Sequence, residues 1–449
     1  MNSLPAMPRN SSPSPQSLRP WDRWARALLL RKLQKLERGE LTLIDDDGAR
    51  RFGGVGELRT TVTVHAGQFY RDAVFGGSLA LAEGYLRGDW DCDDLTAMFR
   101  LVLQNSSFSD GMDRGAPQWQ LALQRWWHAR RANTRRGSKQ NIREHYDLGN
   151  DFFRLWLDDT MCYSSGIFAC GEATMREASL AKIDRICRKL ELQPSDHLLE
   201  IGCGWGALAV HAASRYGCRV TATTISDQQY EETQRRIDAA GLHDRVTLLR
   251  QDYRDLTGTY DKLVSVEMIE AVGHGFLDTF FEQCGKLLNS TGTMVLQAIV
   301  MPDLGYERYL RSVDFIQRYV FPGGCLPSVG AMLDSARRRT DLRLEYVEDF
   351  GTHYAETLRR WRSAFVAKLD EVRRLGYPER FVRLWTYYLC YCEAAFDERA
   401  TGVVQIQFDK PGYRREAATI ELTEAGRRSR LSRAAEVAEL LLPMGAGSS

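Results

Sequence analysis

Residues Leu198-Leu199-Glu200-Ile201-Gly202-Cys203-Gly204-Trp205-Gly206 decide the fold of this chain. In this stretch an apolar run ends in an acid and a glycine-rich turn, and good helix formers follow at 207–213. This order predicts a strand, a tight turn and a helix, which together open a nucleotide-binding α/β sheet. Glycines in such a turn let the backbone approach a ligand where any side chain would collide with it.

The acid and the glycine spacing indicate which ligand the turn binds. Glu200 would repel a pyrophosphate but attract an amine or a sulfonium, and the spacing G-C-G-W-G differs from the G-x-G-x-x-G of dinucleotide sites. We therefore expect S-adenosylmethionine (SAM) rather than NAD or FAD, bound by Glu200 and by Gly202, Gly204 and Gly206. The alternative interpretation of the glycines alone is an ordinary strand–turn–helix corner.

Strands and helices continue to alternate after this turn. Helix-compatible segments at 226–240 and 277–288 separate apolar or β-branched segments, a pattern typical of a parallel sheet covered on both faces. Further strands are expected at 218–224, 244–249, 262–266, 294–299, 342–349 and 403–408. An aromatic helical insertion separates the last two. The sequence therefore predicts an α/β fold, the seven-stranded doubly wound sheet of a class I SAM methyltransferase, with a smaller N-terminal α/β domain.

Composition limits the class of protein. The chain has 449 residues, of which 44% are hydrophobic, enough for two globular domains. Its formal charge of +1 creates no overall field that would attract nucleic acid. The ten cysteines include no CxxC pair, which favours reduced thiols in the cytoplasm over a disulfide framework or a metal site. No apolar run approaches the roughly 18 residues that span a bilayer.

We expect five segments along the chain. They are a disordered tail at 1–20, an N-terminal lipid-associated domain at 21–118, a basic amphipathic segment or linker at 119–140, a catalytic domain at 141–430 and a C-terminal tail at 431–449.

The stretch Trp119–Arg143 contains seven Lys or Arg residues, three Trp residues and no acids. A helix of this composition suits an anionic bilayer surface, where each basic residue contributes about 1 kcal/mol. A solvated interdomain linker is the alternative, and no aromatic platform accompanies the charge for nucleic acid.

Six blocks occur in a fixed order, and together they resemble a known family: EHYDLGNDF, YSS, EIGCGWG, TTIS, QDYRD and FIQRYVFPGG. The chain resembles the cyclopropane-fatty-acyl-phospholipid synthase family and its mycolic-acid-modifying relatives, strongly from about Asn141 to Lys410. The resemblance implies that a methyl(ene) group passes from SAM to the double bond of an unsaturated acyl chain in a membrane phospholipid, giving a cyclopropane fatty acid. It also implies a cytoplasmic protein at the inner face of the membrane, and it leaves a homodimer open.

The resemblance also implies which residues bind SAM. Besides the turn they are Tyr163, Ser164, Thr224, Gln229, Tyr253 and Arg254. An ordinary strand end and helix surface would explain Thr224 and Gln229 without a ligand.

The family is expected to hold a bicarbonate ion as the base that removes a proton after methyl transfer. Glu270, Ile299 through its main chain, and Tyr354 match the expected bicarbonate ligands. Ser165 and Gln297 depart from the pattern, because they stand where Cys and His are usual. Ser and Gln can still hydrogen-bond an anion, but Gln cannot titrate.

Methyl transfer is therefore expected, whereas the product is open between a ring and a methyl-branched or methylated unsaturated chain. Two alternatives of another class are a methyltransferase for a soluble small molecule and a non-catalytic lipid-binding protein.

Overall fold

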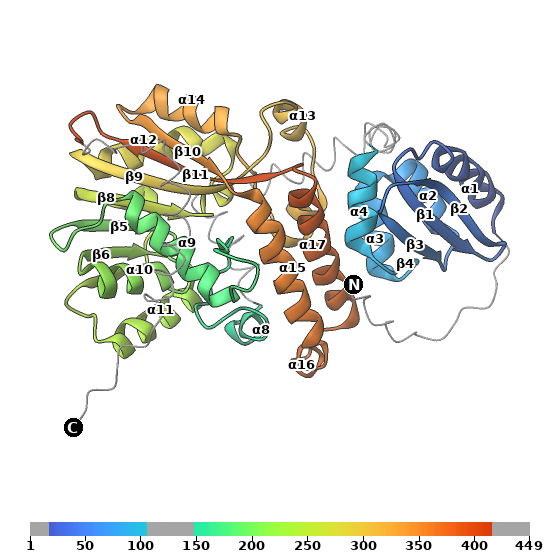
Figure 1. The fold of residues 1–449 in the computed structure, drawn as a ribbon, viewed down its shortest axis with the longest axis horizontal. Helices are drawn as coiled ribbons and strands as arrows, with labels where there is room; N and C mark the ends of the chain where they lie inside the picture. The colour runs from blue at the N-terminus through green and yellow to red at the C-terminus, as the bar shows by residue number, and fades with distance from the viewer. Residues whose placement is uncertain (1–17, 106–147, 415–449) are drawn as a thin grey trace, which may run out of the picture.

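The computed structural model describes residues 18–105 and 148–414, which form two β-sheets joined by helices (Figure 1). Two predicted segments, the basic stretch Trp119–Arg143 and the C-terminal tail at 431–449, lie outside the described residues. So does most of the predicted N-terminal tail at 1–20.

The larger sheet has seven strands in the order β10-β11-β9-β8-β5-β6-β7. Strands β5 to β9 are parallel, and β11 runs antiparallel to both of its neighbours, β9 and β10. The strands are β5 (His197–Ile201), β6 (Arg219–Thr223), β7 (Val246–Leu249), β8 (Tyr260–Val266), β9 (Leu288–Val300), β10 (Arg343–Asp349) and β11 (Gly402–Asp409). Each predicted strand is therefore present, although β9 begins six residues before the predicted segment at 294–299.

Helices cover both faces of this sheet, as the sequence predicts. Alternate residues along the strands point to opposite faces, so that Leu198 and Val264 pack under α9 to α11 whereas Leu199 and Leu263 pack under α12 and α14. These helices are α9 (Met175–Lys189), α10 (Ala207–His211), α11 (Asp227–Ala240), α12 (Leu277–Leu287) and α14 (Val329–Arg339). Ser226 caps the start of α11 and Gly241 ends it in the left-handed conformation.

The predicted aromatic insertion between β10 and β11 is a helical layer at one end of the sheet. It consists of α15 (Gly351–Ala367), α16 (Leu369–Arg374) and α17 (Glu379–Asp397). Two short helices, α8 (Asn150–Arg154) and α13 (Tyr306–Tyr309), lie outside this layer. Trp361 and Trp385 are buried in the layer, and Phe152 of α8 packs edge-on against Trp385 at 5.0 Å between ring centroids.

The N-terminal module is a four-stranded sheet in the order β2-β1-β3-β4, with helices on it. Its elements are α1 (Pro20–Leu33), β1 (Gly39–Asp45), β2 (Gly48–Val55), β3 (Arg59–Val64), α2 (Gln68–Arg71), α3 (Gly77–Arg87), β4 (Trp90–Cys92) and α4 (Leu95–Gln104). The sequence pattern did not indicate β2, because GARRFGGV is almost wholly exposed and lacks apolar alternation.

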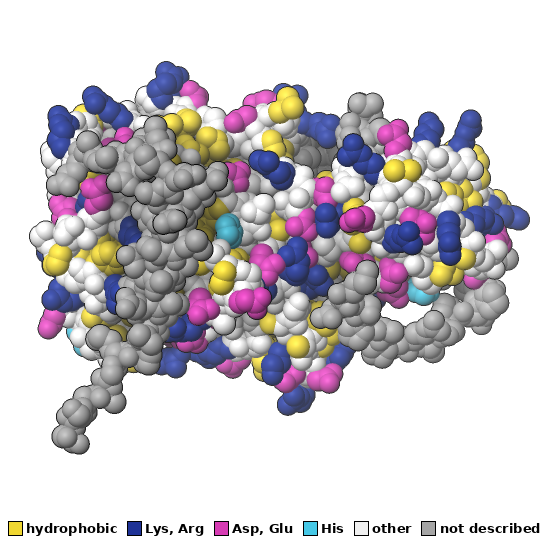
Figure 2. All heavy atoms as spheres, viewed as in Figure 1, with side chains coloured by type: hydrophobic (Ala, Val, Ile, Leu, Met, Phe, Trp, Pro, Cys, Tyr) yellow, Lys and Arg dark blue, Asp and Glu magenta, His cyan; other side chains and the backbone are white. Residues whose placement is uncertain are grey.

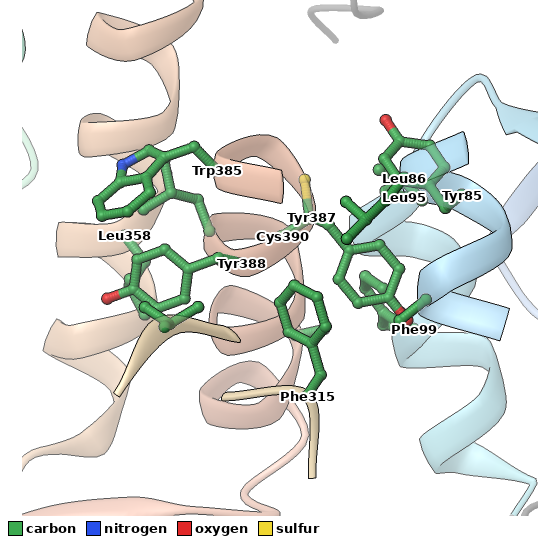
Figure 3. Close-up of a cluster of buried hydrophobic side chains, with 14 of the residues drawn as sticks. Tyr85, Leu86, Leu95, Phe99, Phe315, Leu358, Trp385, Tyr387, Tyr388 and Cys390 are labelled. Carbon is green, nitrogen blue, oxygen red and sulfur yellow. The ribbon is translucent and has the colours of Figure 1, made fainter. Parts of the chain in front are cut away.

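Helix α17 joins this module to the rest of the chain. Tyr85 and Phe99 of the module converge with Phe315 on Tyr387 of α17, which Phe315 approaches to 4.5 Å between ring centroids (Figure 3). The buried Arg383 guanidinium donates to the main-chain oxygen of Trp90 at 2.9 Å and pairs with Asp91 at 2.7 Å.

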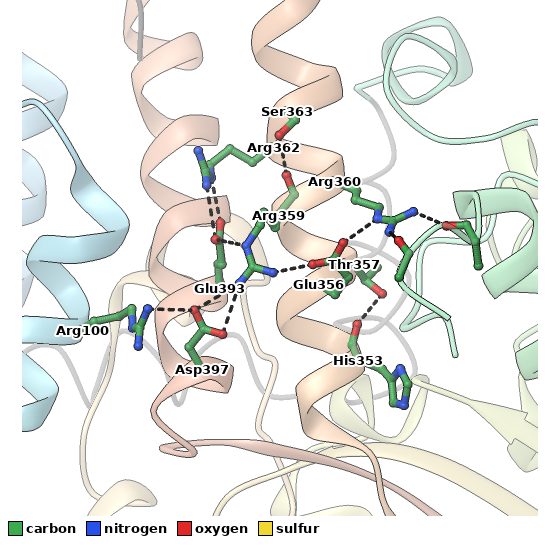
Figure 4. A network of polar contacts seen from close by, with 12 residues as sticks. Arg100, His353, Glu356, Thr357, Arg359, Arg360, Arg362, Ser363, Glu393 and Asp397 are labelled. Atoms are coloured by element: carbon green, nitrogen blue, oxygen red, sulfur yellow. Dashed lines mark hydrogen bonds and ion pairs between the residues drawn. The ribbon is translucent and has the colours of Figure 1, made fainter. Parts of the chain in front are cut away.

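Arg100 of α4 adds ion pairs with Asp397 and Glu398, next to the Arg359–Glu393 pair that links α15 and α17 (Figure 4). The surface that Figure 2 shows carries Lys and Arg interspersed with Asp and Glu, consistent with a net charge of +1. Among residues 18–105 and 148–414, no helix is both long and apolar enough to cross a bilayer.

Candidate active site

One cavity of about 1460 Å³ extends from the carboxyl ends of the parallel strands to the N-terminal sheet. Binding pockets for a single small ligand usually measure about 300–1,000 Å³, so this cavity has room for more than one ligand. One end is lined by the loops after β5, β6 and β8, and the other by apolar side chains of α1, β1 and β3. The cavity therefore lies at the ligand-binding edge of the larger sheet.

The glycine turn after β5 opens onto this cavity. Gly204 has a φ of +54°, and a Cβ added there would meet no heavy atom of the protein within 4 Å. Gly202 also lines the cavity, whereas Gly206 does not. A Cβ on Gly206 would lie 2.6 Å from Thr233 of α11, so Gly206 serves the close packing of turn and helix.

Glu200 and Lys182 place a carboxyl group and an ammonium group beside the turn. Burial raises the pKa of Glu200 to about 8, against the attraction of the Lys182 ammonium. One Glu200 carboxyl oxygen is buried without a hydrogen-bond partner among the described residues. The Lys182 ammonium donates to the Ser164 hydroxyl at 2.7 Å. An orphaned carboxyl oxygen and an open glycine turn fit a cationic ligand such as SAM.

Lys182 was not among the predicted site residues. Its position on α9 carries a signal, because it stands between the buried residues Ala178 and Ile186, four positions from each. A lysine on the buried face of an amphipathic helix needs a polar partner, which here lies at the cavity.

The other residues expected to bind SAM also line the cavity. The Thr224 hydroxyl donates to the Gln229 side chain at 2.9 Å, which joins the end of β6 to the start of α11. Arg254 is held by the carboxylate of Asp252, a cavity residue that the sequence did not single out. Tyr163 shares a hydrogen bond of 2.8 Å with Tyr388 of α17.

Helix α15 holds the loop that carries Tyr163, Ser164 and Ser165 (Figure 4). The Thr357 hydroxyl accepts the main-chain N–H of Gly166 at 3.1 Å and donates to the main-chain oxygen of His353. Arg360 donates to the main-chain oxygens of Gly171 and Ala173. Helix α15 therefore anchors the part of the loop that follows Ser165.

Glu267 lies at the centre of the polar end of the cavity. One carboxylate oxygen accepts the Ser165 main-chain N–H at 2.9 Å and the Gln297 side-chain amide at 2.7 Å. The other oxygen accepts the Tyr354 hydroxyl at 2.8 Å. Burial raises the pKa of Glu267, and these donors oppose the increase. Its φ of +49° is a left-handed conformation that costs a residue with a side chain about 1–2 kcal/mol.

Glu270 follows Glu267 on the short 3₁₀ turn Ile269–Ala271. One of its oxygens accepts the Ile299 main-chain N–H at 2.5 Å, and the other is buried without a hydrogen-bond partner in the described part of the chain. Burial, and secondly the neighbouring Glu267 carboxylate, raise the pKa of Glu270 to about 8. Glu267 has three donors and Glu270 one, so hydrogen bonding favours the ionised form more strongly at Glu267 than at Glu270.

The structure brings together all five residues that were predicted to be catalytic, but in two layers. Glu270, Ile299 and Tyr354 line the cavity. Ser165 and Gln297 are fully buried and lie behind Glu267, to which both donate, and the Ser165 hydroxyl is turned to the main-chain oxygen of Gly166.

These residues therefore do not accommodate the expected bicarbonate ion. The donors of Ser165, Gln297 and Tyr354 already bind the Glu267 side chain, and the Ile299 N–H binds Glu270. Glu267 was missed by the sequence reasoning, although an acid three residues before Glu270 was a signal.

The seven-stranded sheet and the open glycine turn define a class I SAM-dependent methyltransferase. Residues 133–406 match the family model of mycolic acid cyclopropane synthetase, and the chain belongs to this family.

The chain is 37% identical over 327 residues to a tuberculostearic acid methyltransferase of Mycobacterium tuberculosis, an alignment covering 71% of this chain and 76% of the relative. It is also 37% identical to the cyclopropane-fatty-acyl-phospholipid synthase of Escherichia coli, over 79% of this chain and 89% of that one. Both alignments extend beyond half of each protein.

Solved structures show the same likeness. A cyclopropane synthase from Mycobacterium tuberculosis superposes with a TM-score of 0.57 at 30% identity, over 61% of this chain and 98% of that one. A mycolic acid cyclopropane synthase complexed with SAH and CTAB superposes with a TM-score of 0.57 at 32% identity, again over 61% and 98%. The predicted family and fold are confirmed.

Proposed function

We propose that this enzyme transfers a methylene group from SAM to the double bond of unsaturated acyl chains in membrane phospholipids, forming cyclopropane fatty acids. The observation that carries the proposal is the single cavity, which joins the glycine turn and the Glu267–Glu270 pair to a long apolar wall. A methyl donor, a base and an acyl chain can therefore meet in one place.

The proposed reaction makes three demands on the cavity. An isolated alkene is a weak nucleophile, so the sulfonium methyl must be held in line with the double bond. Methyl transfer leaves a carbocation, which the faces of aromatic rings stabilise. Tyr163, Phe321 and Tyr388 line the cavity and supply such rings. The buried surroundings also exclude water, which would trap the cation.

The apolar wall gives the N-terminal module a role as the lipid-associated domain. Its residues Leu29, Leu33, Leu41, Leu43, Val62 and Phe69 all line the cavity. They place no charge along the path of an acyl chain, and burial of each methylene group contributes about 0.8 kcal/mol. Phe321 and Ile316, from the predicted segment FIQRYVFPGG, line the same space.

The names of the relatives support this substrate class. The Escherichia coli relative is a cyclopropane-fatty-acyl-phospholipid synthase, and the two solved structures are a cyclopropane synthase and a mycolic acid cyclopropane synthase. The test is incubation of the purified enzyme with methyl-labelled SAM and phospholipid vesicles. We expect label in monounsaturated lipid and none in its saturated counterpart, with Gly204→Val as the inactive control. Equal labelling of both lipids, or labelling only of water-soluble compounds, would contradict the proposal.

The name of one relative supports a second candidate product. The relative from Mycobacterium tuberculosis is a tuberculostearic acid methyltransferase, and it is as similar to this chain as the Escherichia coli enzyme is. A methyl-branched or methylated unsaturated acyl chain is therefore the alternative product. A ring and an added methylene group have equal mass, so proton NMR of the extracted fatty acids is required. Upfield cyclopropane protons identify the ring, and olefinic or branched-methyl protons identify the alternative.

We further propose that the segment Pro302–Ser312 faces the bilayer at the cavity entrance. Leu304 is 96% exposed and also lines the cavity, and the exposed residues Arg308 and Arg311 line it as well. An exposed leucine at the rim of the cavity suits the interfacial region of a bilayer. A phospholipid could enter the cavity here without leaving the membrane surface.

Leu304→Asp tests this entrance. We expect weaker sedimentation with anionic vesicles and slower turnover on vesicles, with unchanged turnover on a monomeric short-chain unsaturated lipid. Leu375→Asp is the matched control, because Leu375 is 47% exposed at the end of α16 and does not line the cavity (Figure 1). Vesicle binding that is the same in both variants and in the wild type would refute this entrance.

A further inference from the structure

We propose that Glu267 is the resident base of the reaction and does the work expected of bicarbonate. This inference rests on the proposed function, because it concerns the proton removed after methyl transfer.

The hydrogen-bond donors around Glu267 support this role. Of the five groups expected to bind bicarbonate, the N–H of Ser165, the amide of Gln297 and the hydroxyl of Tyr354 all donate to the Glu267 carboxylate. The N–H of Ile299 donates to Glu270, which is the fifth group. Each of these four groups thus already donates to a carboxylate of the chain, and a second negative charge would be repelled by Glu267. The anion that these donors bind is therefore part of the chain.

A hydrogen-bond chain fixes the direction in which Gln297 presents its amide. The Lys189 ammonium, which can only donate, donates to the Gln405 side-chain oxygen at 2.6 Å. The Gln405 amide nitrogen must then donate to the Gln297 oxygen, at 3.0 Å. Gln297 consequently turns its N–H groups toward Glu267. The fixed charge of Lys189 thus orders two buried amides so that they favour the ionised carboxylate.

Glu267 also keeps the capacity to accept a proton. A carboxylate offers about four lone-pair positions, two on each oxygen. The oxygen that accepts the Tyr354 hydroxyl has one donor among the described residues, while the other oxygen has two. The remaining position is thus on the Tyr354-bound oxygen, on a side chain that lines the cavity.

Methyl transfer from SAM is followed by proton transfer to Glu267. The sulfur–methyl bond breaks with its electron pair going to sulfur, and the alkene π pair forms the first new carbon–carbon bond. The Glu267 carboxylate takes a proton from the added methyl group. The released C–H pair forms the second carbon–carbon bond and closes the ring. Glu267 becomes a neutral carboxylic acid, and its proton passes to water after the product leaves.

The first test is the response to bicarbonate. We expect the wild-type enzyme to turn over at the same rate in carbon-dioxide-depleted buffer and in buffer with added bicarbonate. ¹³C NMR of ¹³C-bicarbonate should show no bound species. Glu267→Gln should lower turnover about 10²- to 10⁴-fold, the range for loss of a positioned proton acceptor, with SAM affinity changed less than about threefold. Glu345→Gln, at an exposed position, is the control.

The second test is chemical rescue. Glu267→Gly removes the carboxylate, and glycine adopts a φ of +49° without strain. The vacated donors can then bind a small carboxylate, so we expect bicarbonate, formate or acetate to restore turnover in this variant. Glu267→Gln keeps the space filled and should not be rescued. A residue with a purely structural role would show no such difference.

The outcomes separate this inference from the proposed function. Wild-type turnover that requires bicarbonate, or full activity of Glu267→Gln, would overturn the role of Glu267 and leave the methyl transfer intact. A wild-type enzyme without activity on unsaturated phospholipid would instead overturn the proposed function.

Discussion

Binding of SAM should release a proton from Glu200. Burial raises the pKa of this carboxyl to about 8, so it is protonated at neutral pH in the free enzyme. The cationic methyl donor favours the ionised form, which lowers the pKa in the complex. Affinity for SAM should therefore rise with pH as long as the free enzyme must lose a proton to bind.

The magnitude follows from the fraction ionised. With a pKa of about 8, the ionised fraction of Glu200 rises about ninefold between pH 6 and pH 7, and affinity should rise by the same factor. This interval lies below the usual range of an α-amino group, about 7.7–8.0, so the SAM ammonium stays charged throughout. Titration calorimetry in two buffers of different ionisation enthalpy should show release of about one proton per SAM bound.

Glu200→Gln is the matched control for this linkage. Its neutral amide resembles the protonated carboxyl, so the variant should bind SAM more weakly than the wild type at both pH 6 and pH 7, and its affinity should not rise between them. The reasoning is wrong if wild-type affinity is constant across this interval. It is equally wrong if the variant keeps the ninefold increase, because another group would then be titrating.

Three further predictions concern the turn, the acid pair and the module interface. Gly204→Val should abolish measurable SAM binding in calorimetry while the circular dichroism spectrum is retained, since the side chain would enter the open space in front of the turn. The pKa of Glu270 is about 8 in the folded state, above its usual value, so this residue stabilises the fold fully below about pH 4.5 and loses that contribution as pH rises through 8. Glu270→Gln should therefore flatten the decline in unfolding free energy between pH 5 and 9. Arg383→Met should lower the free energy of unfolding by about 2–4 kcal/mol in urea titration, because it removes charge-assisted hydrogen bonds to Trp90 and Asp91. An unchanged midpoint of unfolding would contradict the role of this contact.

The sequence predicted the larger sheet well because each of its strands is a local apolar segment between recognisable turns. Most residues of Leu198–Ile201 and Lys262–Val266 are apolar and buried, as expected for strands of a sheet that is covered on both faces. The N-terminal strand β2 was not predictable, because its residues are exposed and its pairing with β1 is a tertiary property. The contact of Phe99 with Tyr387 joins positions far apart in the chain, and no local pattern encodes it.

The sequence and the resemblance identified residues of the site, but not which of them line the cavity and which lie behind Glu267. Spacing identified Glu200 and Gly204, which line the cavity, and the resemblance identified Glu270 and Tyr354, which line it too. Sequence could not show that Glu267 would turn its side chain back onto Gln297, because this depends on a left-handed backbone at Glu267.

The ordering of Gln297 by Lys189 leads to a prediction about a positioning residue. Gln405→Met removes the amide that donates to the Gln297 oxygen, so Gln297 is free to rotate its oxygen toward Glu267. Loss of one hydrogen bond to a charged group costs about 1.5–3 kcal/mol, which corresponds to about one to two pH units. Because a base must be ionised, a raised pKa of Glu267 should shift the rising limb of the turnover–pH profile upward by that amount. Turnover at high pH should be preserved.

The other titratable groups near Glu267 are the same in the wild type and this variant, since Gln405→Met does not change Glu270, Lys182 or Tyr354. Gln407→Met is the matched control, because Gln407 lies two residues further along β11 and donates to the Lys189 main-chain oxygen rather than to Gln297. A shift of equal size in both variants would mean that packing around Lys189 sets the pH profile. A shift confined to Gln405→Met would mean that the direction of two buried amides sets the charge of the base.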